Sequence, residues 1–137
     1  MDLIKITPDK EKAKSILRMV ETTMNMISTV DAERFPSNVI VEYYNVIRQL
    51  MTALVLLDGF KTKGEGAHKK LIEYMDENYE EFSGYEINLI DELRTIRNKI
   101  EYDGFFVKID YLERKKRDIT QVIAKLNGTI TKKITVR

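Results

Sequence analysis

Apolar residues recur along this chain at the three-to-four-residue spacing of amphipathic helices. The spacing predicts a first helix that begins with Thr7 as its N-cap and Pro8 at the first helical position, and that ends near Thr29. After a Phe-Pro break, Ser37 is expected to cap a second helix that runs to Asp58. This second segment is apolar on more than one face, so we expect it to be the central helix of the fold.

A polar stretch and two further helices are predicted to follow. Gly59 is expected to end the second helix, and residues 61–66 are expected to form a flexible polar loop. Helical spacing then returns over residues 67–79 and, after a Ser-Gly pair, over residues 85–102. An Asp-Gly pair marks the end of this fourth helix.

The last part of the chain predicts a fifth helix and a tail. Residues 105–107 are short and apolar, and we expect an extended connector tucked against the bundle. Asp110 is expected to cap a helix that runs to Asn127, with Gly128 ending it. The remaining residues, 129–137, are β-branched and basic, which leaves a strand-like arm and a disordered tail as open alternatives.

Five helices with short connections predict an all-α fold, an up-and-down helical bundle of four to five helices. The length of 137 residues fits one domain over residues 1–137, with a core from about 8 to 127 and a tail from 128. The 23 basic and 22 acidic residues nearly cancel, so net charge gives no argument for a nucleic-acid or membrane partner. The absence of cysteine excludes disulfides and thiolate metal sites.

The sequence also bears on location. Its N-terminus lacks an apolar stretch behind a basic start, which argues against a secretory signal. Its longest apolar run, around residues 54–57, is too short to span a bilayer. We therefore expect a cytoplasmic protein without a membrane partner.

Several familiar kinds of site are poorly supported. A single histidine and no cysteine cannot form a His/Cys nucleophile or a histidine-rich metal site. Gly59 and Gly64 have the outer spacing of a phosphate loop, but Glu65 stands where the lysine belongs. Acid pairs such as Glu73 and Glu77 are more typical of a solvated helix face than of a metal cage. We predict no metal and no cofactor.

The candidate chemistry lies near the end of the fourth predicted helix. Its residues are Arg97-Asn98-Lys99-Ile100-Glu101-Tyr102. Helical spacing puts Arg94, Arg97 and Glu101 on one flank, where they could form a surface charge ladder. Tyr102 stands just before the helix break, where its side chain can project into a cleft. Periodicity alone leaves two interpretations open: an ordinary polar flank with Tyr102 as an anchor, or a binding site.

This pattern resembles the signature of HEPN domains, a family of small helical nucleotide- and RNA-binding domains. The similarity extends from about Lys14 to Ile123 and includes the order of the helices and the paired tyrosines Tyr43 and Tyr44 of the central helix. The resemblance implies a bundle that pairs as a homodimer, with the two signature segments facing one cleft. It also implies that no metal is required.

The resemblance assigns roles to individual residues. In nuclease members an arginine would contact the scissile phosphate, and a histidine at the last signature position would help to move a proton from the 2′-OH. Carried over, Arg97 would bind phosphate with its planar fork of donors, Asn98 would orient the ligand, and Arg94 would extend the nucleotide- or RNA-binding site.

Tyr102 stands at the histidine position, and it forms with Arg97 the candidate catalytic pair. Tyrosine titrates near ~10 and histidine near ~6.5, so this replacement favours binding over efficient cleavage. Tyr102 could still hydrogen-bond a phosphate or stack on a base. The only histidine, His68, begins the third predicted helix and is expected to be a surface or capping residue, with a cleft role assembled across a dimer as the alternative.

Three functions follow as alternatives. The first is a nucleotide- or RNA-binding subunit that partners a minimal nucleotidyltransferase in a toxin–antitoxin-like pair. The second is an active metal-independent endoribonuclease in which Tyr102, or a residue of the other protomer, substitutes for the histidine. The third is a structural or interaction bundle without catalysis.

Overall fold

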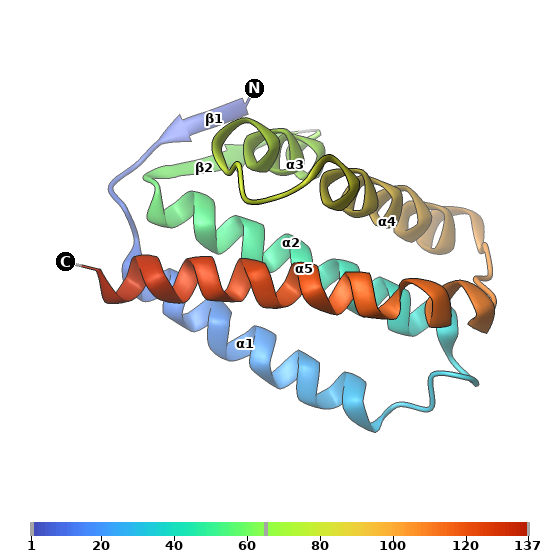
Figure 1. The fold of residues 1–137 in the computed structure, drawn as a ribbon. Helices are drawn as coiled ribbons and strands as arrows, with labels where there is room; N and C mark the ends of the chain where they lie inside the picture. The colour runs from blue at the N-terminus through green and yellow to red at the C-terminus, as the bar shows by residue number, and fades with distance from the viewer. Residues whose placement is uncertain (1, 65, 137) are drawn as a thin grey trace.

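The computed structural model describes residues 2–64 and 66–136. Within them it contains a helical bundle and a two-stranded ribbon (Figure 1). The elements in chain order are β1 (Asp2–Lys5), α1 (Lys10–Thr29), α2 (Pro36–Leu57), β2 (Phe60–Lys63), α3 (Ala67–Asn78), α4 (Gly84–Asp103) and α5 (Ile109–Thr135). The predicted all-α bundle is confirmed.

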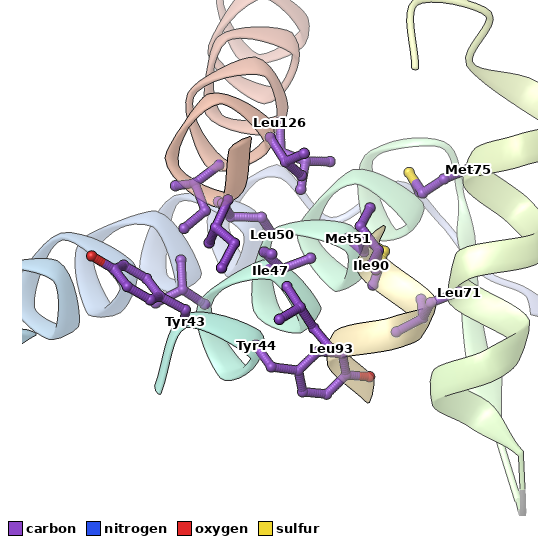
Figure 2. Close-up of a cluster of buried hydrophobic side chains, with 14 of the residues drawn as sticks. Tyr43, Tyr44, Ile47, Leu50, Met51, Leu71, Met75, Ile90, Leu93 and Leu126 are labelled. Atoms are coloured by element: carbon purple, nitrogen blue, oxygen red, sulfur yellow. The ribbon is translucent and has the colours of Figure 1, made fainter. Parts of the chain in front are cut away.

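Helix α2 is the centre of the core, as its all-round apolar sequence predicts. It packs against each of the other four helices. Tyr44, Ile47, Leu50 and Met51 are fully buried along it. Figure 2 shows side chains of α3, α4 and α5 converging on these residues, with Leu126 contributed by α5.

The composition of α2 would also suit a membrane span. Its best 18-residue window has a mean hydropathy of 1.3. The rest of the protein buries 67% of that window. Burial in the bundle accounts for its apolar character.

The first surprise is the β-ribbon, because residues 61–63 were expected to be part of a flexible loop. Strands β1 and β2 pair antiparallel, with Asp2 opposite Lys63. The N–H of Ile6 then donates to the carbonyl of Gly59 at 2.8 Å. Gly59 has a φ of +89°, and a Cβ there would lie 3.2 Å from the Ile6 carbonyl oxygen, so this close approach favours glycine.

Helix α1 begins later than predicted. Its N-cap is Asp9, whose carboxylate accepts from the N–H of Lys12 at 3.0 Å, and Thr7 is not the cap. The N–H of Asp9 donates to the carbonyl of Leu56 at 3.2 Å, which ties the chain around Pro8 to the end of α2 and keeps it outside the helix. A carboxylate at this position also interacts favourably with the helix dipole.

Ser37 does not cap α2, although the sequence predicted that it would. Phe35 occupies the N-cap position of α2, and Ser37 lies inside the first turn. Its hydroxyl accepts a hydrogen bond from the N–H of Val107 at 2.7 Å. The connector between α4 and α5 was predicted to pack against the bundle. That prediction is correct for Val107, which is buried, and wrong for Phe105 and Phe106, which are exposed.

Helix α5 starts at a different residue than predicted. Lys108 is the N-cap and makes no side-chain capping bond. Asp110 lies inside the first turn, where its negative charge still complements the helix dipole. The element was predicted correctly, and its boundary was not.

The end of α5 was predicted wrongly. The helix passes through Gly128 and continues to Thr135, so the predicted tail is helical up to that residue, and Val136 is its extended C-cap. Arg137 lies outside the described residues. Ile130 is fully buried, and Lys133 donates to Asp58 at 2.8 Å, so tertiary contacts carry the helix past the glycine.

Asp58 joins three elements at this end of the bundle. Its second carboxylate oxygen accepts from the hydroxyl of Tyr74 at 2.7 Å and from that of Tyr79 at 2.5 Å. Burial and these hydrogen bonds raise the pKa of both tyrosines. Asp58 thus links the ends of α2, α3 and α5.

Helix α4 carries the candidate signature and is well delimited. Ser83 and Glu86 form a reciprocal capping box at its start, with bonds of 3.1 Å and 2.9 Å. Lys125 of α5 donates to Glu86 at 2.8 Å. At the other end, Gly104 is the C-cap with a left-handed φ of 65°. The predicted helix is confirmed to within a residue at each end.

Replacement of Ser83 by alanine is expected to lower the free energy of unfolding by ~1 kcal/mol, because one orphan N–H of α4 loses its acceptor. Burial raises the pKa of Glu86, but bonds from Lys125 and Ser83 outweigh burial and hold that pKa below 4.5. The unfolded chain therefore binds protons first, and the stabilisation present at neutral pH is lost as pH falls through the lowered pKa. Urea unfolding at neutral and acidic pH measures both effects. Equal losses for Ser83→Ala and the surface change Thr22→Ala would contradict this account.

Candidate functional site

The predicted signature borders a cavity of about 270 Å³ between the start of α3 and the second half of α4. Its lining residues are Gly64, Gly66, Ala67, His68, Lys69, Arg94, Arg97, Asn98 and Tyr102. The loop from β2 into α3 forms one wall, and α4 forms the other. The ribbon and the packing of α3 on α4 position the two walls.

Arg97 is largely enclosed by its neighbours. Its side chain is only 16% exposed. One terminal N–H donates to the amide oxygen of Asn98 at 3.1 Å. Its Nε lies 3.4 Å from Glu101, close enough for an ion pair, but the N–H is not aligned for a hydrogen bond and is buried without one among the described residues. Arg97 thus retains unused donor capacity.

Two further arginines, Arg94 and Arg48, lie in the same region as Arg97. Arg94 is held by Asp91, with Nε at 2.9 Å from the carboxylate. Arg48 comes from α2, and its Nε is buried without a hydrogen-bond partner among the described residues. The charges of Arg48, Arg94 and Arg97 all act on His68 and on Tyr44. Helices α2 and α4 therefore contribute arginines, and α3 contributes His68, to one region of the protein.

His68 lies at the start of α3, as predicted, but its side chain makes no capping hydrogen bond. It lies in the first turn of α3 and is half-buried, and it lines the same cavity as Arg97 within one chain. Its ring centroid is 6.1 Å from that of Tyr44, with the planes tilted by 52°. Burial, followed by the charges of the three arginines, lowers the pKa of His68. The imidazole is therefore neutral at neutral pH and can accept a proton.

Tyr44 underlies this region from α2. Its side chain is fully buried, and its hydroxyl has no hydrogen-bond partner among the described residues. Burial raises the pKa of Tyr44, although the nearby arginines partly oppose that shift. Figure 2 shows its ring in the cluster of buried side chains that includes Leu93 of α4. A buried hydroxyl without a partner costs free energy.

All four predicted binding residues line this one cavity. Arg94, Arg97 and Asn98 are partly buried in its wall, while Tyr102 is 74% exposed at its edge. Sequence periodicity did not identify Arg48 or His68, because it does not show which helices become neighbours. A signal for Arg48 was present: it stands four residues after Tyr44, on the same face of a helix.

The arrangement is suited to an anion. Guanidinium groups bind phosphate and carboxylate bidentately, and Lys69 adds an exposed cation at the rim. Asp91 and Glu101 offset part of the positive charge by pairing with Arg94 and Arg97. Over the described part of the chain, His, Asp and Glu side chains nowhere gather in a group of three that could hold a metal ion.

Comparison of the chain with models of known protein families, with curated proteins and with solved structures finds no match. The residues and geometry of the cavity are therefore the basis for assigning a function.

Proposed function

We propose that this chain is a HEPN-type domain that binds the phosphate groups of a nucleotide or RNA in the cavity between α3 and α4. One observation carries the proposal: Arg94 and Arg97 line this cavity beside a neutral His68, and the charge of Arg48 from α2 also acts on that histidine. Buried donors usually have hydrogen-bond acceptors, whereas here the Nε of Arg48 and that of Arg97 are buried without one among the described residues.

A nucleotide fits these groups better than a simple anion does. Phosphate oxygens would accept from the arginines. Tyr102, exposed at the cavity edge, offers an aromatic face on which a base can stack. Asn98 carries an amide that can donate to or accept from the ligand. The residues thus provide for both the charged and the aromatic parts of a nucleotide.

Replacement of Arg97 by alanine is expected to lower the affinity for a single-stranded RNA by about 10- to 150-fold, since hydrogen bonds to charged groups contribute ~1.5–3 kcal/mol. Loss of one phosphate contact should also reduce the slope of log affinity against log salt by ~0.7. Fluorescence anisotropy with a labelled RNA at several salt concentrations measures both quantities. Arg18→Ala is the matched control, because Arg18 is an exposed arginine of α1, and that helix lies on the side of the bundle away from α3 and α4 (Figure 1).

A second variant distinguishes a loss of binding from a loss of folding. Arg97→Lys keeps the charge and loses the planar fork, so intermediate affinity is expected. Circular dichroism establishes that each variant is folded. Equal RNA affinity for the Arg97→Ala and Arg18→Ala proteins would contradict the proposed function, and so would a wild-type protein that binds neither RNA nor mononucleotide.

The expected homodimer and the expected nucleotidyltransferase partner stay predictions. Sedimentation of the purified protein tests the first. Co-purification with a small nucleotidyltransferase encoded by a neighbouring gene tests the second. A monomeric protein that co-purifies with no nucleotidyltransferase would contradict both predictions and leave the proposed phosphate site unaffected.

RNA cleavage is the second candidate function, and the position of His68 favours it. Neutral His68 would take the proton of a 2′-OH as the 2′-oxygen attacks phosphorus, and the P–O5′ bond would break, with the 5′-oxygen taking a proton from water. Arg97 would stabilise the charge that develops on the phosphate. The products would be a 2′,3′-cyclic phosphate and a 5′-hydroxyl, which end-specific labelling can detect in the presence of a chelator.

A further inference from the structure

A second cavity, of about 390 Å³, lies beside the connector between α4 and α5. Its lining residues are Ile96, Lys99, Phe105, Phe106, Val107, Lys108, Asp110, Tyr111 and Arg114. Two of them are exposed to a degree that is unusual for phenylalanine, 84% for Phe106 and 47% for Phe105. The bond between Val107 and Ser37 fixes the connector, so these rings are displayed on an anchored segment.

Cations accompany the aromatic rings. The ammonium of Lys99 lies 5.9 Å from the ring centroid of Phe105, and the guanidinium of Arg114 lies 5.7 Å from that of Tyr111. Lys108 adds a third cation to the lining, against one carboxylate from Asp110. Exposed rings interleaved with lysine and arginine are the arrangement by which proteins hold single-stranded nucleic acid, since bases stack on rings and cations meet phosphates.

The two cavities lie along adjacent flanks of the last turns of α4. Asn98 lines the first cavity and Lys99 the second, and successive helix residues project ~100° apart. Tyr102, four residues after Asn98, projects ~40° from it in the direction of Lys99. The exposed Tyr102 ring therefore lies on the path from the phosphate-binding cavity to the phenylalanines.

We propose that a single strand of RNA with a phosphate in the first cavity continues over Tyr102 and stacks a base against Phe106 in the second cavity. The proposal depends on the proposed phosphate site and names its ligand as a strand several nucleotides long rather than a mononucleotide. The positive surroundings of the rings favour this occupant over a second copy of the chain, which carries almost no net charge.

The test compares an octa-adenosine RNA with AMP on the full-length protein. Phe106→Ala is expected to lower the affinity for octa-adenosine by about 5- to 150-fold, the range that corresponds to ~1–3 kcal/mol per stacked base, and to leave the AMP affinity unchanged. This loss should be similar at low and high salt, unlike that of Arg97→Ala. Phe106→Tyr keeps a stacking ring and should retain affinity. Phe35→Ala, which removes another exposed phenylalanine beside an arginine, should have no effect.

The outcomes separate the two proposals. If Arg97→Ala loses affinity for RNA and Phe106→Ala does not, the base platform is wrong while the phosphate site stands. If wild-type protein binds neither RNA nor AMP, both are wrong. Sedimentation of each variant gives the remaining case: loss of self-association in Phe106→Ala, with any change in RNA affinity following it, would assign the phenylalanines to a protein interface and overturn the inference.

Discussion

Replacement of His68 by asparagine is expected to lower the rate of RNA cleavage by ~10²- to 10⁴-fold, the usual effect of removing a general base. RNA affinity should stay within a few-fold of wild type, because a neutral imidazole makes no ionic contact with phosphate. Asparagine is suitable because it keeps a polar side chain against Tyr44 in a half-buried position. Quantifying cyclic-phosphate products under single-turnover conditions separates the chemical step from binding.

The pH dependence gives this prediction a direction. The base must be deprotonated, and burial with the three arginines lowers the pKa of His68 in the free protein. The profile of kcat/KM should therefore fall only below the usual histidine range as pH decreases. A bound phosphate would raise the pKa of His68, so the kcat profile should fall at a higher pH than the kcat/KM profile does.

Controls decide between His68 and Tyr102. Tyr102→Phe keeps the ring and removes the hydroxyl. If that change abolishes cleavage while His68→Asn does not, Tyr102 is the acid–base group. A wild-type protein that yields no cyclic-phosphate ends would leave binding as the function and remove the nuclease candidate.

Replacement of Asp58 by alanine is expected to lower the free energy of unfolding by ~2–4 kcal/mol. The change leaves the hydroxyls of Tyr74 and Tyr79 without their shared acceptor, and hydrogen bonds to a charged group contribute ~1.5–3 kcal/mol. Lys133 adds less, because its side chain is 38% exposed and solvent screens the pair. Urea unfolding measures the loss.

Asp58→Asn provides the graded comparison. The amide keeps one acceptor oxygen for the tyrosines but loses the charge that pairs with Lys133, so a smaller loss is expected. Asp118→Ala is the surface control, because Asp118 accepts from the exposed hydroxyl of Tyr85. Similar losses for Asp58→Ala and Asp118→Ala would show that the three-element junction contributes little.

Local sequence signals predicted helix boundaries well where capping residues at the ends of the helix determine them. Helix α4 has a capping box at Ser83 and Glu86 and a glycine in a left-handed conformation at its end, so both boundaries could be predicted. The helix in which Gly128 lies shows the opposite case. A glycine usually ends a helix, but here Ile130 enters the core beyond it and Lys133 reaches Asp58. Such contacts come from distant parts of the chain.

The β-ribbon and the contributions of α2 and α3 to the site were missed for the same physical reason. Each strand has four residues, too few for a recognisable alternation, and each finds its partner far along the chain. The side chains of Arg94, Arg97, Asn98 and Tyr102 could be grouped because they share one helix. His68 and Arg48 belong to other helices, and only the packing of α3 and α2 against α4 brings them to the same region.

The crowding of Arg48, Arg94 and Arg97 has a cost for the protein alone. Like charges repel, and only two of the three have a carboxylate within ion-pair distance among the described residues. A bound polyanion would relieve that repulsion, so ligand affinity and thermal stability are thermodynamically linked at this one spot. Selection for heat tolerance alone would therefore tend to remove one of these arginines. Persistence of all three under such selection would indicate that ligand recognition, not folding stability, retains them.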